Sequence, residues 1–186
     1  MVALRKGDTL SLIGPLGNGF PPPAPDSVPV LVAGGYGMAA LYLQAASAPR
    51  PGLAFFGGAT AEDILCVPEF EALGWTVRIA TEDGSLGVRG LVTAPLDEWL
   101  AAPDCPARIE CFACGPNGML RAVAGRAARA GFRAWLSMDR SMGCGVGACL
   151  TCVQSLRAPD GSVVRARVCK EGPVFAADAV VWEDDE

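Results

Sequence analysis

Between residues 28 and 136, short apolar runs alternate with longer stretches that have a helical pattern. The strand-like runs are 28–33, 53–57, 76–80, 108–112 and 133–136, and the helical stretches between them are 38–46, 61–73, 95–101 and 117–130. The strand-like runs are apolar almost throughout, so both of their faces are expected to be buried. Strands that alternate with helices form a parallel sheet covered on both faces. The sequence therefore predicts an α/β nucleotide-binding domain over residues 28–136.

The two flanking regions have a different character. In residues 1–27, the run GDTLSLIG is typical of a strand and PLGNGFPPPAPDS of a rigid linker, but a lone strand cannot pair its own backbone groups. In residues 137–186 the helical periodicity stops. A cysteine-rich loop is followed there by two strand candidates, CVQSL and VVRARV, around the turn APDGS. We expect a remnant strand with a linker at the start and a small second lobe at the end.

Composition narrows the class of protein. Hydrophobic residues make up 51% of the chain, the net charge is −5, and no basic block is present. These values argue against nucleic acid or an anionic membrane as a partner. The apolar stretch 29–46 contains three glycines near its middle, so a strand, turn and helix explain it better than a membrane span. With no signal peptide at MVALRKGDTL, we expect a soluble, cytoplasmic protein.

Eight cysteines without a signal peptide indicate metal or redox chemistry rather than a disulfide scaffold. Histidine is absent, which excludes histidine-ligated zinc, Rieske-type clusters and a histidine general base within this chain. We expect any bound metal to be held mainly by sulfur. Cys66, Cys105 and Cys111 are interpreted as ordinary small or buried residues.

Four cysteines form the strongest motif. Cys144, Cys149 and Cys152 have the spacing C-x4-C-x2-C, and Cys169 follows after sixteen residues. This is the plant-ferredoxin spacing for a [2Fe-2S] cluster. The glycines at 143, 145 and 147 would permit positive φ angles and bring N–H groups to the cluster sulfurs. A four-cysteine zinc knot usually has two short cysteine hooks, but it remains an alternative, as do unligated thiols.

Three loops that follow strands are candidates for nucleotide binding, because the carboxyl ends of parallel strands meet at one edge of a sheet. AGGYG could admit a phosphate, Glu82 or Asp83 in TEDGS could accept ribose hydroxyls, and Cys114 in ACGP could line a nicotinamide site. A tight turn, a plain acidic turn and core packing are the respective alternatives. The candidate residues are Gly34, Gly35, Gly37, Thr81, Asp83, Gly84, Cys114, Gly115 and Pro116.

Six segments appear together in one order: GPLGNGF, AGGYG, TEDGSLGVRGLVT, FACGPNGML, SMDRSMGCGVGACLTC and VCKEGPVF. In these the chain resembles the electron-transfer subunits of bacterial NAD-linked dihydroorotate dehydrogenase, in the ferredoxin-reductase-like superfamily. The resemblance implies FAD, a [2Fe-2S] cluster and docking on an FMN-containing catalytic subunit, as a heterotetramer. Electrons from dihydroorotate would pass from FMN through the cluster to FAD and then, as hydride, to NAD, in pyrimidine biosynthesis.

The chain departs from the family pattern in two places. Ala40 takes the place of a proline in the glycine turn, which affects the entry into the helix rather than the chemistry. The family's flavin-binding β-barrel precedes GPLGNGF, and its flavin-contacting motifs have no counterpart here. A cluster passes single electrons and a nicotinamide takes two, so a flavin must stand between them.

Three explanations of the missing barrel follow. Either the start is internal to a longer gene product, or another chain supplies the barrel, or the protein does not reduce NAD alone; we expect the first. The isolated chain should then be inactive. Two other functions stay open. One is an electron-transfer subunit of a hydrogenase, sulfide dehydrogenase or transhydrogenase-like complex, and the other is a non-enzymatic, metal-stabilised interaction module.

Overall fold

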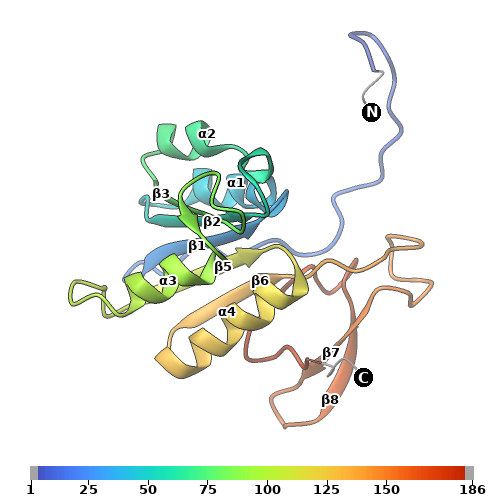
Figure 1. The fold of residues 1–186 in the computed structure, drawn as a ribbon. Coiled ribbons are helices and arrows are strands. Elements are labelled where there is room, and N and C mark those ends of the chain that lie inside the picture. Colours follow the sequence, from blue (N-terminus) through green and yellow to red (C-terminus); the bar gives the residue numbers. More distant parts are fainter. Residues whose placement is uncertain (1–3, 183–186) are drawn as a thin grey trace.

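The computed structural model describes residues 4–182, which form a seven-stranded sheet flanked by helices, with a separate two-stranded hairpin (Figure 1). The strand order in the sheet is β4-β3-β2-β1-β5-β6-β9. All neighbouring strands in this sheet are parallel except the last pair, β6 and β9. Its strands are β1 (Val28–Gly34), β2 (Leu53–Gly58), β3 (Thr76–Thr81), β4 (Val88–Arg89), β5 (Ile109–Cys114), β6 (Arg133–Ser137) and β9 (Val174–Ala176).

The helices cover both faces of the sheet (Figure 1). Helices α1 (Gly37–Ser47) and α2 (Val67–Ala72) lie on one face, and α3 (Thr93–Leu100) and α4 (Asn117–Ala130) lie on the other. Successive residues of β1 point to opposite faces, so Leu31 joins the core under α1 while Val30 and Val32 join the core under α4. All three side chains are fully buried. The predicted α/β class with a parallel sheet covered on both faces is therefore confirmed.

Helix α4 has the bounds that the sequence predicts. Leu120, Val123 and Ala127 form its buried stripe, and the helix ends at Gly131, whose φ of 75° lies in the left-handed region that glycine tolerates. On its outer side, Arg126 forms two hydrogen bonds of 2.6 Å to the carboxylate of Asp97 on α3. This bidentate pair joins the two helices on that face of the sheet.

The single helix expected over residues 61–73 is wrong. The segment contains a short 3-10 turn, η1 (Ala61–Asp63), and the separate helix α2. Between them Cys66 has a φ of 60°. Pro68 lacks an N–H group and is accepted only in the first turn of a helix, so the helix has to begin again just before it.

The strand expected at GDTLSLIG is also wrong for the chain as described. Residues 7–14 are in no strand, and the segment extends away from the sheet (Figure 1). The side chains of Leu12 and Ile13 are 79% and 76% exposed. A strand needs a neighbouring edge with which to pair, and no edge of this sheet lies beside the segment. Its apolar residues are left in solvent as a result.

The linker that follows is fixed to the sheet. The Glu110 carboxylate, buried on β5, accepts a hydrogen bond of 2.7 Å from the backbone N–H of Ala24 and one of 2.9 Å from the indole of Trp135. The ring of Phe20 packs edge-on against Phe112, with centroids 5.8 Å apart. The buried carboxylate thus has its hydrogen bonds satisfied while it holds the linker in place.

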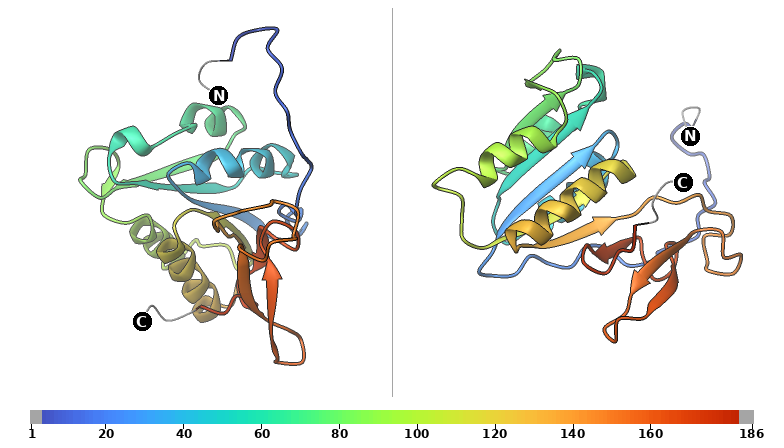
Figure 2. Two further views of the ribbon diagram at one scale, coloured as in Figure 1. Left: turned by 90° about the vertical axis from the view of Figure 1, so that its right-hand side faces the viewer. Right: turned by 60° about the horizontal axis from the view of Figure 1, so that its bottom comes forward.

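The last part of the chain forms the hairpin β7 (Val153–Arg157) and β8 (Val163–Arg167), which projects beside the sheet (Figure 2). The chain then returns to the sheet, where β9 pairs antiparallel with β6. The division into residues 1–27, 28–136 and 137–186 stays a prediction, with the qualification that β9 from the last part completes the sheet. None of the helices within residues 4–182 has both the length and the apolar character needed to cross a membrane.

Candidate functional site

The first pair of predicted cysteine ligands lies in the loop between β6 and β7. Ala148 and Cys149 direct their backbone N–H groups at the Cys144 sulfur, with distances of 3.2 and 3.4 Å. These N–H groups, with that of Val146, lower the pKa of Cys144 to about 6, and the Cys149 N–H has the largest effect. The Thr151 hydroxyl donates to the Cys149 sulfur at 3.2 Å and lowers the pKa of that thiol. The loop therefore favours thiolates, the form that binds metal.

The second pair joins the end of this loop to the turn after β8. The backbone N–H of Cys169 lies 3.4 Å from the Cys152 sulfur, and the Val168 N–H donates to the Cys152 carbonyl at 2.8 Å. Both cysteines are buried, at 2% and 5% exposed. The pKa of Cys169 is raised, first by the hydrogen bond with the Cys152 thiol and then by burial, while a backbone hydrogen bond from Gly147 acts in the opposite sense. The four cysteines thus form two neighbouring pairs.

Two of the three loop glycines have the expected backbone conformation. Gly145 and Gly147 have φ angles of 70° and 83°, and a Cβ at Gly147 would lie 2.8 Å from the Lys170 side chain. Gly143 does not have a positive φ, so that part of the expectation is wrong. Glycine suits position 143 for a different reason: a Cβ there would lie only 3.1 Å from the Cys149 sulfur.

The predicted nucleotide loops meet at the carboxyl edge of the sheet, where they border a cavity of about 480 Å³. Gly34, Gly35 and Pro116 line it, as the sequence predicts. Two carboxylates, Asp63 and Glu82, also line this cavity. A volume of this size is in the range of small-molecule sites.

Three other predicted residues build the turn beside this cavity rather than its lining. The Thr81 hydroxyl donates to the Leu86 carbonyl at 2.8 Å, and the Asp83 carboxylate accepts from the Ser85 hydroxyl at 2.6 Å. The Ser85 hydroxyl and N–H lower the pKa of Asp83. Gly84 has a φ of 77° in the same turn. Of the two acidic residues in TEDGS, Glu82 is therefore the one that lines the cavity.

The remaining predicted residues line a second cavity, of about 590 Å³, which separates the sheet edge from the cysteine loop. Gly37, Cys114 and Gly115 border it on the sheet side, and Met138 and Met142 border it on the loop side. Burial raises the pKa of Cys114, which keeps this thiol protonated. The structure thus distributes the three predicted loops over two adjoining cavities.

Sequence reasoning missed the contribution of β2 to the first cavity. Gly57 and Gly58 end this strand and line the cavity. A Cβ on Gly57 would come within 2.6 Å of Val92, and one on Gly58 within 2.6 Å of the Asp63 side chain. The glycine pair in FFGG, which directly follows a buried strand, is the signal that could have identified them.

Comparison with known proteins gives one family for the C-terminal part and for the chain as a whole. Residues 139–181 match the iron-sulfur cluster binding domain of dihydroorotate dehydrogenase B. The electron transfer subunit of dihydroorotate dehydrogenase B (NAD(+)) from Desulforamulus reducens is 35% identical over 182 residues, which cover 96% of this chain and 68% of that subunit. The corresponding subunit from Geobacillus kaustophilus is 40% identical, with 95% of this chain and 67% of that subunit covered.

A solved structure of another oxidoreductase has a similar fold. The NADH-dependent reduced ferredoxin-NADP oxidoreductase, studied for flavin-based electron bifurcation, superposes with a TM-score of 0.77 at 29% identity. The match covers 96% of this chain and 63% of that one, so this chain spans less than two thirds of it. From the extent and identity of the sequence matches, the chain belongs to the family of electron transfer subunits of dihydroorotate dehydrogenase B.

Proposed function

We propose that this chain carries electrons between a [2Fe-2S] cluster and NAD, by way of a flavin, for a dihydroorotate dehydrogenase catalytic subunit. The observation that carries the proposal is the arrangement of the four cysteines in two pairs, in which the N–H of Cys149 lies 3.4 Å from the Cys144 sulfur and the N–H of Cys169 lies 3.4 Å from the Cys152 sulfur. Met142, two residues before Cys144, borders the cavity that adjoins the predicted nucleotide site. One-electron and two-electron centres would then lie close to each other.

The paired sulfurs suit a two-iron cluster. In a [2Fe-2S] cluster each iron takes two cysteine thiolates, so the ligand set divides into two pairs. A structural zinc instead needs four ligands around one ion. Among the side chains of residues 4–182, no three histidine, cysteine, aspartate or glutamate residues are grouped as a site for a single metal ion. The donor set of four cysteines, with backbone N–H groups aimed at the sulfurs, fits the cluster.

The first cavity supports NAD as the nucleotide. The glycine turn after β1 lets a phosphate approach the backbone at the start of α1. Asp63 and Glu82 line the cavity, and no lysine or arginine is among its described lining residues. A carboxylate accepts hydrogen bonds from a ribose but repels a 2′-phosphate. We therefore infer NAD rather than NADP, with Glu82 as the ribose acceptor.

The second cavity supports a flavin between the two centres. It is bordered by Cys114 and Tyr36 on the sheet side and by Met142, two residues before Cys144, on the cluster side. A flavin supplies the conversion between single electrons and a hydride. The described lining contains apolar walls for a ring, but no residue of the 4–17 segment. These residues would hold one side of the ring, and we infer that the exposed apolar segment 7–14 pairs with a barrel that encloses the rest.

The surface around the cysteine loop supports a protein partner. Met142, Val146 and Leu150 are 51%, 49% and 61% exposed, and they belong to the same loop as the exposed Cys149. An apolar rim at a redox centre suits docking of a second subunit, because apolar contacts would bring the centres close. We infer that this partner is the FMN-containing catalytic subunit and that the two assemble as a heterotetramer.

Metal analysis of protein purified without oxygen tests the proposal. About two irons and two sulfides per chain, with the visible absorption of a [2Fe-2S] centre, are expected. Stoichiometric zinc without iron would contradict the cluster and favour the interaction module. For the partner, co-expression with the dihydroorotate dehydrogenase catalytic subunit of the same genome should yield a complex, and the absence of one would contradict the assignment.

A further inference from the structure

The turn that carries Cys169 is closed by the side chain of Arg167. The backbone N–H of Arg167 donates to the Glu171 carboxylate at 2.7 Å, and the guanidinium Nε donates to the same oxygen at 3.0 Å. The Arg167 Nη2 is paired with the other carboxylate oxygen. The Arg167 carbonyl in turn accepts from the N–H groups of Lys170 and Glu171, at 3.0 and 2.8 Å. Both ends of the turn are thus held by one residue.

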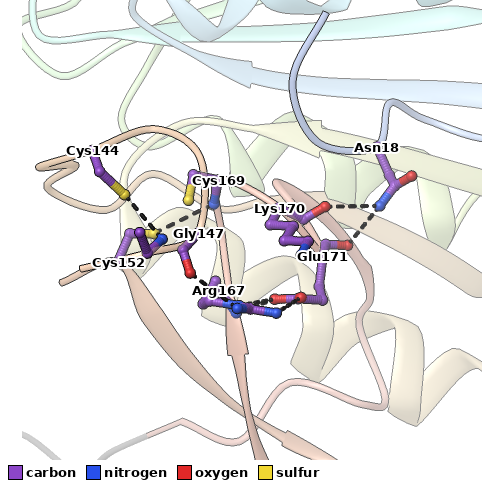
Figure 3. Close-up of polar contacts among 9 residues, drawn as sticks. Asn18, Cys144, Gly147, Cys152, Arg167, Cys169, Lys170 and Glu171 are labelled. Carbon is purple, nitrogen blue, oxygen red and sulfur yellow. Dashed lines mark hydrogen bonds and ion pairs between the residues drawn. The ribbon is translucent and has the colours of Figure 1, made fainter. Parts of the chain in front are cut away.

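The same guanidinium reaches across to the cysteine loop. Its Nη1 donates to the backbone carbonyl of Gly147 at 2.9 Å, so that Arg167 lies between Gly147 and Glu171 (Figure 3). Gly147 lies between Cys144 and Cys149 in the sequence. The segment with the first pair of cysteines and the turn with Cys169 are therefore joined through one side chain.

We propose that Arg167 is a positioning residue for the iron-sulfur cluster, which holds the loop of Cys144 and Cys149 at a fixed distance from the turn of Cys169. The inference rests on the proposed function, because it requires that the four cysteines hold a cluster. Arg167 itself touches no cysteine sulfur by any hydrogen bond described in residues 4–182. It acts through the Gly147 carbonyl on one side and Glu171 on the other.

Arginine suits this role because its planar group presents several N–H donors in a fixed geometry. Three N–H groups of the guanidinium are used at once, two on the carboxylate and one on the carbonyl. A lysine at this position would keep the positive charge but could not hold both partners in the same geometry. Replacement of Arg167 by lysine therefore separates the effect of the hydrogen-bond geometry from the effect of the positive charge.

The ion pair also sets the charge beside the cluster. With both partners present, the positive charge of Arg167 and the negative charge of Glu171 largely cancel. Removing the cation leaves a carboxylate near the cluster and disfavours the more negative reduced state, so the midpoint potential should fall. Removing the carboxylate leaves the cation, so the midpoint potential should rise. If Arg167 and Glu171 only stabilised the fold, their separate removal would not shift the midpoint potential in opposite directions.

The test uses the full chain with its cluster, bound during anaerobic purification or reconstituted, in four forms: wild type, Arg167→Met, Arg167→Lys and Glu171→Gln. The release of iron to a ferrous chelator is timed, and the midpoint potential is measured at low ionic strength to limit screening. Loss of the charge-assisted hydrogen bonds should speed the release of iron by about tenfold or more in Arg167→Met. Arg167→Lys should also release iron faster while its potential stays close to that of the wild type.

Arg165→Met is the matched control. Arg165 lies on the same face of β8, two residues earlier, and is exposed. It should release iron at the wild-type rate with little change of potential. Circular dichroism verifies that each variant is folded. If Arg167→Met does not fold, the test rests on Arg167→Lys and Glu171→Gln.

The outcomes separate the two proposals. Wild-type iron release in folded Arg167→Lys, together with a wild-type potential in folded Glu171→Gln, would overturn the positioning role while leaving the cluster assignment intact. Shifts of the same sign in Arg167→Met and Glu171→Gln would also overturn it, since they would reflect general loosening of the fold. A wild-type chain that binds no iron and sulfide would defeat the proposed function, and the positioning role with it.

Discussion

Asn18 and Glu171 lie 153 positions apart in the sequence, yet the side-chain amide of Asn18 donates to the Glu171 backbone carbonyl at 3.0 Å (Figure 3). The same amide lies 3.3 Å from the Lys170 carbonyl, and the Asn18 backbone N–H donates to the Gly172 carbonyl at 2.5 Å. The preceding Gly17 has a φ of 68°, and a Cβ there would collide with the Gly172 carbonyl. The segment GPLGNGF is therefore fastened to the turn that carries Cys169.

The variant Asn18→Ala should weaken this attachment. The lost hydrogen bonds are exposed, so the free energy of unfolding should fall by about 0.5–1.5 kcal/mol. For a chain of this size, each kcal/mol of lost stability lowers the melting temperature by about 2–4 °C. Leu12→Ala is the control, because its side chain is 79% exposed and its loss should leave the melting temperature unchanged. Equal melting temperatures for both variants and the wild type would show that Asn18 contributes nothing.

The variant Cys149→Ser should lose the cluster or bind it weakly. Serine replaces a soft thiolate with a hard hydroxyl oxygen, which suits the iron of such clusters poorly. Cys66→Ser should keep a full cluster, since Cys66 lies at the start of α2, away from the cysteine loop. Iron and sulfide analysis with visible absorption distinguishes the two variants. An intact cluster in Cys149→Ser would remove this residue from the ligand set.

The variant Glu82→Gln should bind NAD about tenfold more weakly or worse, because a charge-assisted hydrogen bond to the ribose would be lost. Titration calorimetry with NAD measures the change. Asp83→Asn is the matched control, because the Asp83 carboxylate is used within its own turn, on the Ser85 hydroxyl and N–H. If Asp83→Asn weakened binding more than Glu82→Gln, the ribose acceptor would have been misassigned.

The ion pair between Asp97 and Arg126 should make a small, acid-sensitive contribution to stability. Arg126 lowers the pKa of Asp97, chiefly through the side-chain hydrogen bonds. A carboxyl whose pKa is depressed in the folded state stabilises that state at pH values above its ordinary pKa of about 4, and the contribution is lost as the pH falls further, through the depressed pKa of the folded state. Because Asp97 is half exposed, the contribution should be about 1 kcal/mol or less. In urea unfolding experiments, Asp97→Asn should thus be slightly less stable than the wild type at pH 7, and this difference should shrink as the pH is lowered below about 4.

The chain of 186 residues, made alone, should retain little FAD. The walls available for a ring come from the sheet edge and from the cysteine loop, and the exposed segment 4–17 contributes none of the described lining. A flavin needs enclosing walls and donors for its pyrophosphate. Absorption spectra after gel filtration with added FAD measure the retention, and NADH-dependent reduction of a one-electron dye should be weak. Near-stoichiometric FAD with good activity would show that the flavin site lies elsewhere in this chain.

The sequence predicts most of the central fold because local patterns and tertiary packing agree there. Residues 117–130 have a glycine stop and the periodicity of a helix, with Met119, Leu120, Val123 and Ala127 on one face. The last three are buried on α4, whereas Met119 is only partly buried and borders the first cavity. The sequence also predicts the two strands of the C-terminal hairpin, at CVQSL and VVRARV. It does not predict the short strand β9, because three residues are too few to show a period and because the pairing of β9 with β6 depends on the path of the whole lobe.

At the site, the sequence locates loops better than it locates side chains. The strand ends place AGGYG and ACGP at one edge, but the two loops border two cavities rather than one. Whether Glu82 or Asp83 faces the cavity depends on the hydrogen bonds of the turn, which composition does not reveal. The strand expected over 7–14 fails for a related reason, since its residue pattern is local and a strand needs a neighbouring edge.

The cluster lobe leaves the sheet at the end of β6 and returns to it at β9, so its two ends are attached to adjacent strands. A lobe attached by a single linker could move relative to the sheet, and the distance between two redox centres would then change with that motion. Electron tunnelling slows steeply as that distance increases. With two anchors on one rigid sheet, the separation between the cysteine loop and the nucleotide edge is a property of the fold. The speed of internal transfer would then depend on architecture rather than on a docking motion within the subunit.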